Sequence, residues 1–384
     1  MRLIGADTRA VQPNDLTVHE WGTFTSVAGE DGSAIDWDAL GCKDDLPGFV
    51  NDFGYRGLKG RVQGTVRMET PVLYLYNSRE LDAHVNVEFP QGLITEWYPQ
   101  AKLDVFQTRR NGVVGRLPAN LNGFDTSLRS LTGTIEWRNI KVQPGTAPTL
   151  PVENGRSRYY AARRTDAAPI AVGDQHEQFL FYRGVGRFAV PLSVRLSADG
   201  QVVVENRGEH SVPGAILFEN RAGRVGYRYA NAIQSAVTLD PPSLDGSLAQ
   251  LQSDLETALV AEGLFPTEAR AMVETWRDSW FEEGSRLIYL VPAHAVDSIL
   301  PLRVEPAPSR TVRVFVGRIE LLTSNTTRSI EEALVKDDWA TMDRYARFID
   351  PILKRIGAGD PAKTHRIEQL GRNIQESVGD ERCR

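Results

Sequence analysis

The sequence predicts a mainly β protein: an antiparallel β-sandwich-like body with a helical insertion and a helical C-terminal cap. Three observations predict this class. Between about residues 16 and 239, short alternating or apolar runs are separated by turn residues, which is typical of antiparallel strands. After Asp240-Pro241-Pro242 the apolar residues recur at helical spacing. The same spacing returns from Ser329 onward.

The chain has 384 residues, more than a typical single domain, so a large body with additions is expected. We predict four segments: a β-rich body at 1–240, a helical insertion at 241–285, strands returning to the body at 286–324, and a C-terminal helical cap at 325–384. Hydrophobic residues make up 41% and charged residues 24%, which excludes a disordered chain.

Turn residues divide the body into hairpins. Glu30-Asp31-Gly32, Ala198-Asp199-Gly200 and Arg221-Ala222-Gly223 have hairpin-turn composition. Further strands are predicted at 66–76, 83–89, 93–98, 132–142, 158–163, 178–183 and 188–196. Alternation in the second of these directs His84 to water.

Helix signals mark the insertion and the cap. Thr267 has the position of an N-cap for the second helix of the insertion. Strands at 286–291 and 310–322 follow it. In the cap, Ser329 and Glu332 have the spacing of a capping box, and a last helix is predicted near 363–378.

Charge and hydropathy limit the partners. The net charge of −6 gives no basic footprint, so we predict no nucleic-acid partner. No apolar run reaches the roughly 20 residues of a membrane-spanning helix, so no membrane span is expected. As written the chain predicts a cytoplasmic protein, and a periplasmic or secreted one if a leader has been removed. Cys42 and Cys383 are far apart in sequence, and we expect two unpaired thiols.

Two charged residues occupy core positions of strands. Alternation places Glu20 on the face of Val18 and Phe24, and Arg183 on the face of Phe179 and Phe181. A charge removed from water costs several kcal/mol unless it is paired. We therefore expect buried partners for both, and each has the right sign to pair with the other.

Several carboxylates lie in or beside strands next to large apolar residues. Burial raises the pKa of a carboxyl, and a nearby arginine keeps another ionised, which is the basis of acid/base hydrolysis. The leading functional prediction is a hydrolase, acting on glycans. Glu20 and Glu69 form its acid/base pair, Glu96 assists, and Arg183 orients the substrate. The alternative is a structural ion network, since both arrangements perturb pKa values.

Aromatic residues accompany these acids, as they do in carbohydrate sites. The predicted substrate-binding residues are His19, Trp21, Trp97, Tyr98 and Tyr182. The alternative function is a non-catalytic carbohydrate- or ligand-binding protein that uses Trp21, Trp97 and Tyr98 as a stacking platform. A second alternative is a structural assembly subunit. The expected partner is a small-molecule or glycan ligand, and the sequence does not indicate an oligomeric state.

No metal motif is complete. His176-Glu177 begins like a zinc-protease helix, but Leu180 stands where the second histidine is needed. His210, His294 and His365 show no ligand spacing. We predict no cofactor, and a transition-metal ion would have to be held by residues that the fold brings together.

Three segments carry a resemblance to a known set of proteins. His19-Glu20-Trp21-Gly22-Thr23-Phe24-Thr25, Met68-Glu69-Thr70-Pro71 and Glu282-Glu283-Gly284-Ser285-Arg286 resemble an uncharacterised bacterial family over most of the chain. The resemblance implies export and no particular reaction.

Overall fold

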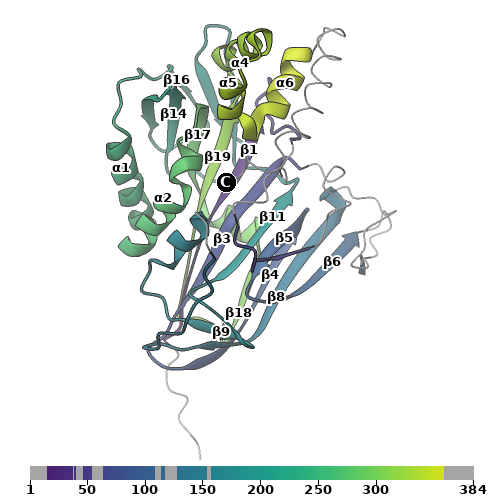
Figure 1. Cartoon of the computed structure of the whole chain (residues 1–384), viewed down its shortest axis with the longest axis vertical. Coiled ribbons are helices and arrows are strands. Elements are labelled where there is room, and N and C mark those ends of the chain that lie inside the picture. The colour runs from purple at the N-terminus through teal and green to yellow at the C-terminus, as the bar shows by residue number, and fades with distance from the viewer. Residues whose placement is uncertain are drawn as a thin grey trace, which may run out of the picture.

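The computed structural model describes residues 15–37, 39, 46–53, 64–108, 114–116, 128–153 and 157–358. It confirms a mainly β protein with a large mixed sheet, a smaller antiparallel sheet and C-terminal helices (Figure 1). The predicted last helix near 363–378, Cys42 and Cys383 lie outside the described residues.

The large sheet runs through eleven strands in the order β10-β9-β8-β5-β11-β3-β1-β19-β17-β14-β15. Their bounds, in chain order, are β1 (Thr17–Ala28), β3 (Val66–Tyr76), β5 (Gly92–Tyr98), β8 (Leu131–Val142), β9 (Ile170–Val172), β10 (Gln175–Glu177), β11 (Leu180–Gly186), β14 (Ala215–Arg221), β15 (Arg224–Ala230), β17 (Gly284–Val291) and β19 (Arg310–Leu321). Further strands branch from this path: β2 (Asn51–Asp52), β4 (Leu81–Pro90), β6 (Lys102–Thr108), β7 (Val114–Arg116) and β18 (Leu302–Glu305). The smaller sheet contains β12 (Leu192–Leu196), β13 (Val202–Asn206) and β16 (Ala236–Leu239).

Strand β1 lies near the middle of the large sheet. It pairs antiparallel with β3 and parallel with β19, so the sheet is mixed. Every residue of β1 after Thr17 is buried. Both faces of this strand are therefore covered. Because its charged residues are shielded from water, they require polar partners inside the protein.

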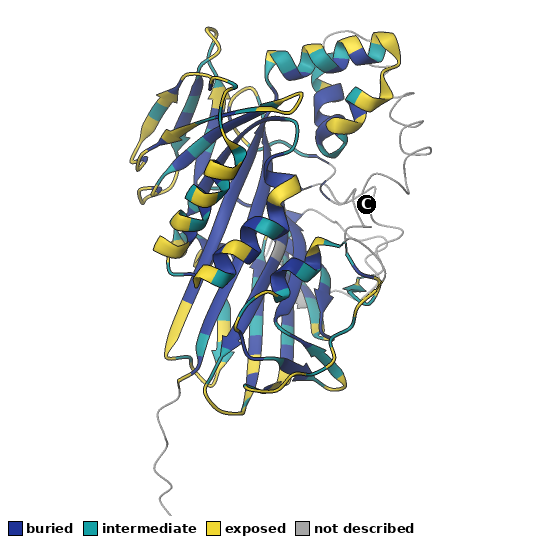
Figure 2. Cartoon of the chain, turned by 60° about the vertical axis from the view of Figure 1, so that its left-hand side comes forward, coloured by how far each residue is buried: buried dark blue, intermediate teal, exposed yellow. Residues whose placement is uncertain are grey.

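Three apolar clusters cover the sheet. The first joins residues of the central strands with residues of β4, β8 and the smaller sheet. The second lies under α1 (Leu248–Ala261) and α2 (Pro266–Trp280), whose buried sides face the sheet (Figure 2). The third lies under α4 (Ser324–Lys336), α5 (Trp339–Arg344), η4 (Ala346–Phe348) and α6 (Ile349–Gly357). None of the helices in the described ranges is long and apolar enough to cross a membrane.

Several predicted elements are confirmed. Strand β3 has the predicted bounds, and the hairpin turns use backbone conformations that favour glycine. Gly32, Gly200 and Gly223 have φ values of 83°, 83° and 78°, and Ala222 before the last has 51°. Two successive residues with positive φ join β14 to β15 in the tight turn that matches strand twist. His84 is exposed, as alternation predicts.

Other local predictions are wrong. Residues 158–163, predicted as a strand, form a 3-10 helix, η3 (Arg158–Arg163). Ser157 caps its first turn, because the Ser157 side chain accepts a hydrogen bond from the Tyr159 N–H. Helix α2 begins at Pro266, one residue before the predicted cap Thr267. Helix α4 is capped by Thr323 and contains Ser329 in its interior. The sequence also gave no sign of α3 (Ala293–Ile299) or of β18.

The pairing of β1 with β3 contains an irregularity. The register between these strands shifts between Trp21 and Thr23. A Cβ on Gly22 would lie 2.8 Å from the Phe315 ring and 3.2 Å from the Pro71 Cα. Glycine is therefore needed at this bulge because neighbouring groups approach the backbone closely.

Gly317 of β19 offers a test of this close packing. A Cβ at this position would fall against the ring of the buried Tyr289 on β17. We expect Gly317→Ala to lower the free energy of unfolding by about 1–3 kcal/mol, measured by urea denaturation. The control Gly208→Ala lies in an exposed loop with space for the methyl group and should change it by less than about 0.5 kcal/mol. Equal effects of the two substitutions would contradict the packing argument.

Candidate functional site

Glu20 is fully buried, as alternation predicts, and it lies in an ion pair. Its carboxylate accepts a bond from Arg313 Nε at 2.6 Å and another from the Tyr182 hydroxyl. Arg313 extends the chain of contacts to Asp297 of α3 at 2.8 Å. Burial and the Glu20 charge raise the pKa of Tyr182, so its hydroxyl remains a donor to Glu20.

The predicted pairing of Glu20 with Arg183 is wrong. The carboxylate of Glu20 binds Arg313 and Tyr182, the residue that precedes Arg183 on β11. Arg183 is buried and stands opposite Glu96 in the register of β11 and β5. Glu96 itself is half-buried and accepts a bond from Thr95 Oγ1.

Glu69 lies on the other face of the sheet and is ion-paired with Arg347 of η4. Burial acts to raise the pKa of Glu69. The charges of Arg347 and Arg67, with the Thr25 hydroxyl, outweigh it and hold the pKa at about 2, below the ordinary 4.5. Thr25 shares the β1 face of Trp21, whereas Glu20 shares that of Phe24. The predicted acid/base pair of Glu20 and Glu69 is therefore not assembled.

The predicted stacking platform is also wrong, because its rings are buried. Trp21, Trp97 and Tyr98 are 0%, 8% and 4% exposed. Trp97 packs in the first apolar cluster, together with Tyr182, whereas Trp21 and Tyr98 pack in the second. These side chains build the core on both faces of the sheet and present no open aromatic surface.

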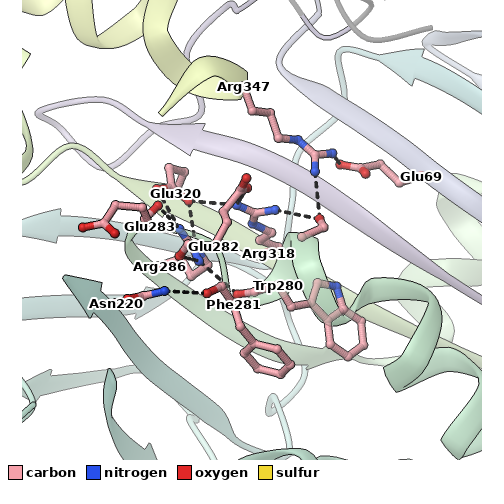
Figure 3. Close-up of polar contacts among 11 residues, drawn as sticks. Glu69, Asn220, Trp280, Phe281, Glu282, Glu283, Arg286, Arg318, Glu320 and Arg347 are labelled. Carbon is pink, nitrogen blue, oxygen red and sulfur yellow. Dashed lines mark hydrogen bonds and ion pairs between the residues drawn. The ribbon is translucent and has the colours of Figure 1, made fainter. Parts of the chain in front are cut away.

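A network of arginines and glutamates joins the end of α2 to β17 and β19 (Figure 3). Arg286 is fully buried, binds Glu320 with Nε at 2.9 Å, and donates to the carbonyl oxygens of Trp280, Glu282 and Glu283. These carbonyls follow the last turn of α2, so Arg286 satisfies acceptors that the helix leaves open. Arg318 and Arg347 both donate to Ser279 Oγ, at 3.0 and 2.8 Å. The network connects α2, the sheet and the C-terminal helices.

His19 belongs to a second buried polar cluster, at the opposite end of α2. Its Nδ1 lies 2.7 Å from Glu268, and its ring stacks on Phe265 with centroids 4.5 Å apart. Glu268 also accepts from the Tyr76 hydroxyl at 2.8 Å and from the Phe265 N–H at 2.8 Å. Both His19 and Glu268 are fully buried. Glu268 thus contacts three polar groups and fixes the orientation of Tyr76.

Tyr76 forms part of the wall of an open cleft of about 720 Å³. The cleft lies where β3 ends and the loops after β8 and before β9 meet. Its polar lining consists of Asp15, Tyr76, Asn77, Ser78, Thr146, Asp166 and Gln178. Prolines, alanines and Leu150 complete the wall, and none of the described lining residues is Lys, Arg or His.

The first turn of α2 holds two residues of the cleft. Glu268 accepts from Tyr76, and Thr267 Oγ1 donates to Asp166 at 3.2 Å. Asn77 adds an unsatisfied group: among the described residues its Oδ1 is buried without a hydrogen-bond partner, whereas its Nδ2 donates to the Arg79 carbonyl at 2.7 Å. Buried acceptors in native proteins are normally satisfied, so Asn77 Oδ1 is an exception within the wall of the cleft.

Most residues of the cleft and of the ion pairs were not predicted from the sequence. Arg313, Arg347 and Glu268 lie far along the chain from their partners, and nothing in their spacing indicates those contacts. The one local signal was Glu268 three residues after Phe265, the spacing at which a helix side chain reaches back to the preceding N–H.

Comparisons with known proteins do not identify a family. No family model matches the sequence, and no curated protein matches it. Among solved structures, the yeast delta-COP-I mu-homology domain complexed with a Dsl1 WxWxV peptide is similar at 8% identity, over 81% of this chain and 98% of that chain, with a TM-score of 0.28. A GH2 beta-galacturonidase from Eisenbergiella tayi aligns at 10% identity over 81% of this chain and 43% of that chain, with a TM-score of 0.11. Similarities at these TM-scores carry no argument about fold or function.

A stability measurement tests the structural role of Glu20. Glu20→Gln removes the charge that compensates the buried Arg313, and we expect the free energy of unfolding to fall by about 3–5 kcal/mol. Asp297→Asn removes the exposed partner of the same arginine and should cost about 1 kcal/mol or less. A loss below about 1 kcal/mol for Glu20→Gln would show that the ion pair does not stabilise the fold.

The low pKa of Glu69 predicts a pH-dependent contribution to stability. A folded-state pKa of about 2 against 4.5 stabilises the protein above pH 4.5, and this stabilisation is lost as the pH falls toward 2. At neutral pH we expect Glu69→Gln to lower the free energy of unfolding by on the order of 3 kcal/mol. Chemical denaturation from pH 7 to pH 3 should show this difference shrinking below pH 4.5. A difference that stays constant over this range excludes the proposed ion pair with Arg347.

Proposed function

We propose that this protein is a non-catalytic binding protein whose ligand, a short neutral or amine-bearing glycan, occupies the cleft between Tyr76, Asn77 and Asp166. The observation that carries this proposal is the cleft itself. It is open to solvent, has a volume of about 720 Å³, and is walled in part by Asn77, whose buried Oδ1 has no hydrogen-bond partner among the described residues and would reach a ligand after a rotation of the side chain. Pockets of this size bind small molecules in many proteins.

The chemistry of the lining favours donors on the ligand. Carboxylate, amide and hydroxyl oxygens of Asp15, Asn77, Ser78 and Asp166 accept hydrogen bonds from hydroxyl or ammonium groups. Two carboxylates without a basic residue among the described lining disfavour anions. Proline faces supply the apolar contacts that the carbon atoms of a sugar ring need.

Binding fits the cleft better than acid/base catalysis does. The Tyr76 hydroxyl is committed to Glu268, and burial together with the Glu268 charge raises its pKa, so Tyr76 keeps its proton. Asp15 accepts from the Ser78 N–H at 3.2 Å, and its bonds to Ser78 lower its pKa. A general acid or base needs a pKa near the working pH, and neither Tyr76 nor Asp15 meets this requirement.

The hydrolase that the sequence first suggests would need a different arrangement. Glu20 and Glu69 would have to reach one substrate, yet each is buried in its own ion pair on its own face of the sheet. Their environments support structural roles. The binding hypothesis therefore takes precedence over the catalytic one.

Three trisaccharides that differ in charge test the proposal. By isothermal titration calorimetry we expect tri-glucosamine and tri-N-acetylglucosamine to bind and a uronate trisaccharide not to bind. Asn77→Ala removes the free acceptor and should weaken binding by about tenfold, the effect of one lost hydrogen bond.

Asn86→Ala is the matched control. Asn86 is a half-buried asparagine of β4 whose Nδ2 donates to the Ile135 carbonyl, and it is not part of the cleft. Its removal should leave the affinity unchanged. Failure of all three sugars to bind, or equal losses in both variants, would overturn the proposal.

A further inference from the structure

The fold brings two of the histidines together at the surface. His210 lies in the connection between β13 and β14, and His294 is the second residue of α3. Their ring centroids are 3.8 Å apart with an interplanar angle of 43°. Both residues are exposed, so this contact lies in water and contributes little apolar burial.

We propose that His210 and His294 form a binding site for a divalent transition-metal ion. Imidazole nitrogen is a preferred ligand of zinc, copper and nickel. Because metal–nitrogen bonds are about 2.0–2.1 Å long and lie in the ring plane, side-chain rotations that turn one nitrogen of each ring toward a common point let both rings bind one ion. The site is separate from the cleft and independent of the proposed glycan binding.

The backbone on both sides of the site is fixed, which lowers the cost of binding. Asn206 Nδ2 donates to the His210 carbonyl at 2.8 Å and to the Ile233 carbonyl at 3.0 Å. On the other side, α3 is anchored by Arg313 through Asp297 and by the buried side chain of Val296. The backbone positions that carry the two imidazole rings are therefore fixed before a metal ion arrives, and only the side chains need to rotate.

The ligand count determines the character of the site. In the part of the chain that the structure describes, no group of three or more His, Cys, Asp or Glu residues is placed to hold a metal. The ion would have two protein ligands and keep water at its other positions. The bound ion exchanges with solvent and links α3 to the loop after β13. The site binds Cu²⁺ more tightly than Ni²⁺ or Zn²⁺.

Titration of the untagged full-length chain tests the site. We expect calorimetry with Ni²⁺ to show one ion bound per chain, and His210→Asn or His294→Asn each to weaken binding by at least about tenfold. His84→Asn is the matched control: His84 is exposed but lies apart from this pair, accepting from the Asn139 N–H. It should bind Ni²⁺ as the wild type does.

Electron paramagnetic resonance with one equivalent of Cu²⁺ supplies a direct readout. The wild-type spectrum should show hyperfine coupling from two imidazole nitrogens, and the spectrum of either variant should lose one of them. The absence of a bound ion, or a spectrum and affinity that are unchanged in both variants, would overturn the assignment.

Discussion

Burial of β1 on both faces is the constraint on which the structure depends. A strand that runs through the centre of the sheet and touches all three apolar clusters leaves no solvent for His19 or Glu20. Each of these residues must therefore find a polar partner inside the protein. His19 reaches Glu268 of α2, and Glu20 reaches Arg313, which in turn holds Asp297 of α3. The contacts that these buried residues make therefore attach α2 and α3 to the sheet.

Three sequence segments, at 19–25, 68–71 and 282–286, share this role. Gly22 of the first packs against Pro71 of the second, and Glu69 beside that proline binds Arg347 of η4. Arg286 of the third satisfies the carbonyl oxygens at the end of α2. Residues that a catalytic interpretation would treat as reactive groups are instead the attachments of α2, α3 and the C-terminal helices. A motif of polar residues in buried strands needs no chemistry to explain it when each residue has a structural partner.

The sequence predicted what depends on local pattern. Alternation placed Glu20 and Arg183 in the core, and turn residues located the hairpins, because both follow from geometry within a few residues. It could not predict the parallel pairing of β1 with β19, because the paired residues, such as Thr17 and Arg310, lie far apart in the sequence. The predicted pair of Glu20 and Glu69 also fails, because β3 is not an unbroken strand. Met68 and Leu73 face the same cluster although their positions differ in parity, so the strand changes face near Pro71. One irregularity was enough to move Glu69 to the opposite face from Glu20.

Helix α2 connects the regions that matter most. Its first turn holds Tyr76 and Asp166 of the cleft through Glu268 and Thr267. Its last turn contributes Ser279, which accepts from Arg318 of the sheet and Arg347 of the C-terminal helices. Polar contacts at both ends and the apolar stripe between them leave the helix little freedom to shift on the sheet. The wall of the cleft at Tyr76 is therefore set by Glu268, the same residue that burial of His19 in β1 demands as a partner. A ligand in this cleft would meet a site whose geometry is determined before it binds.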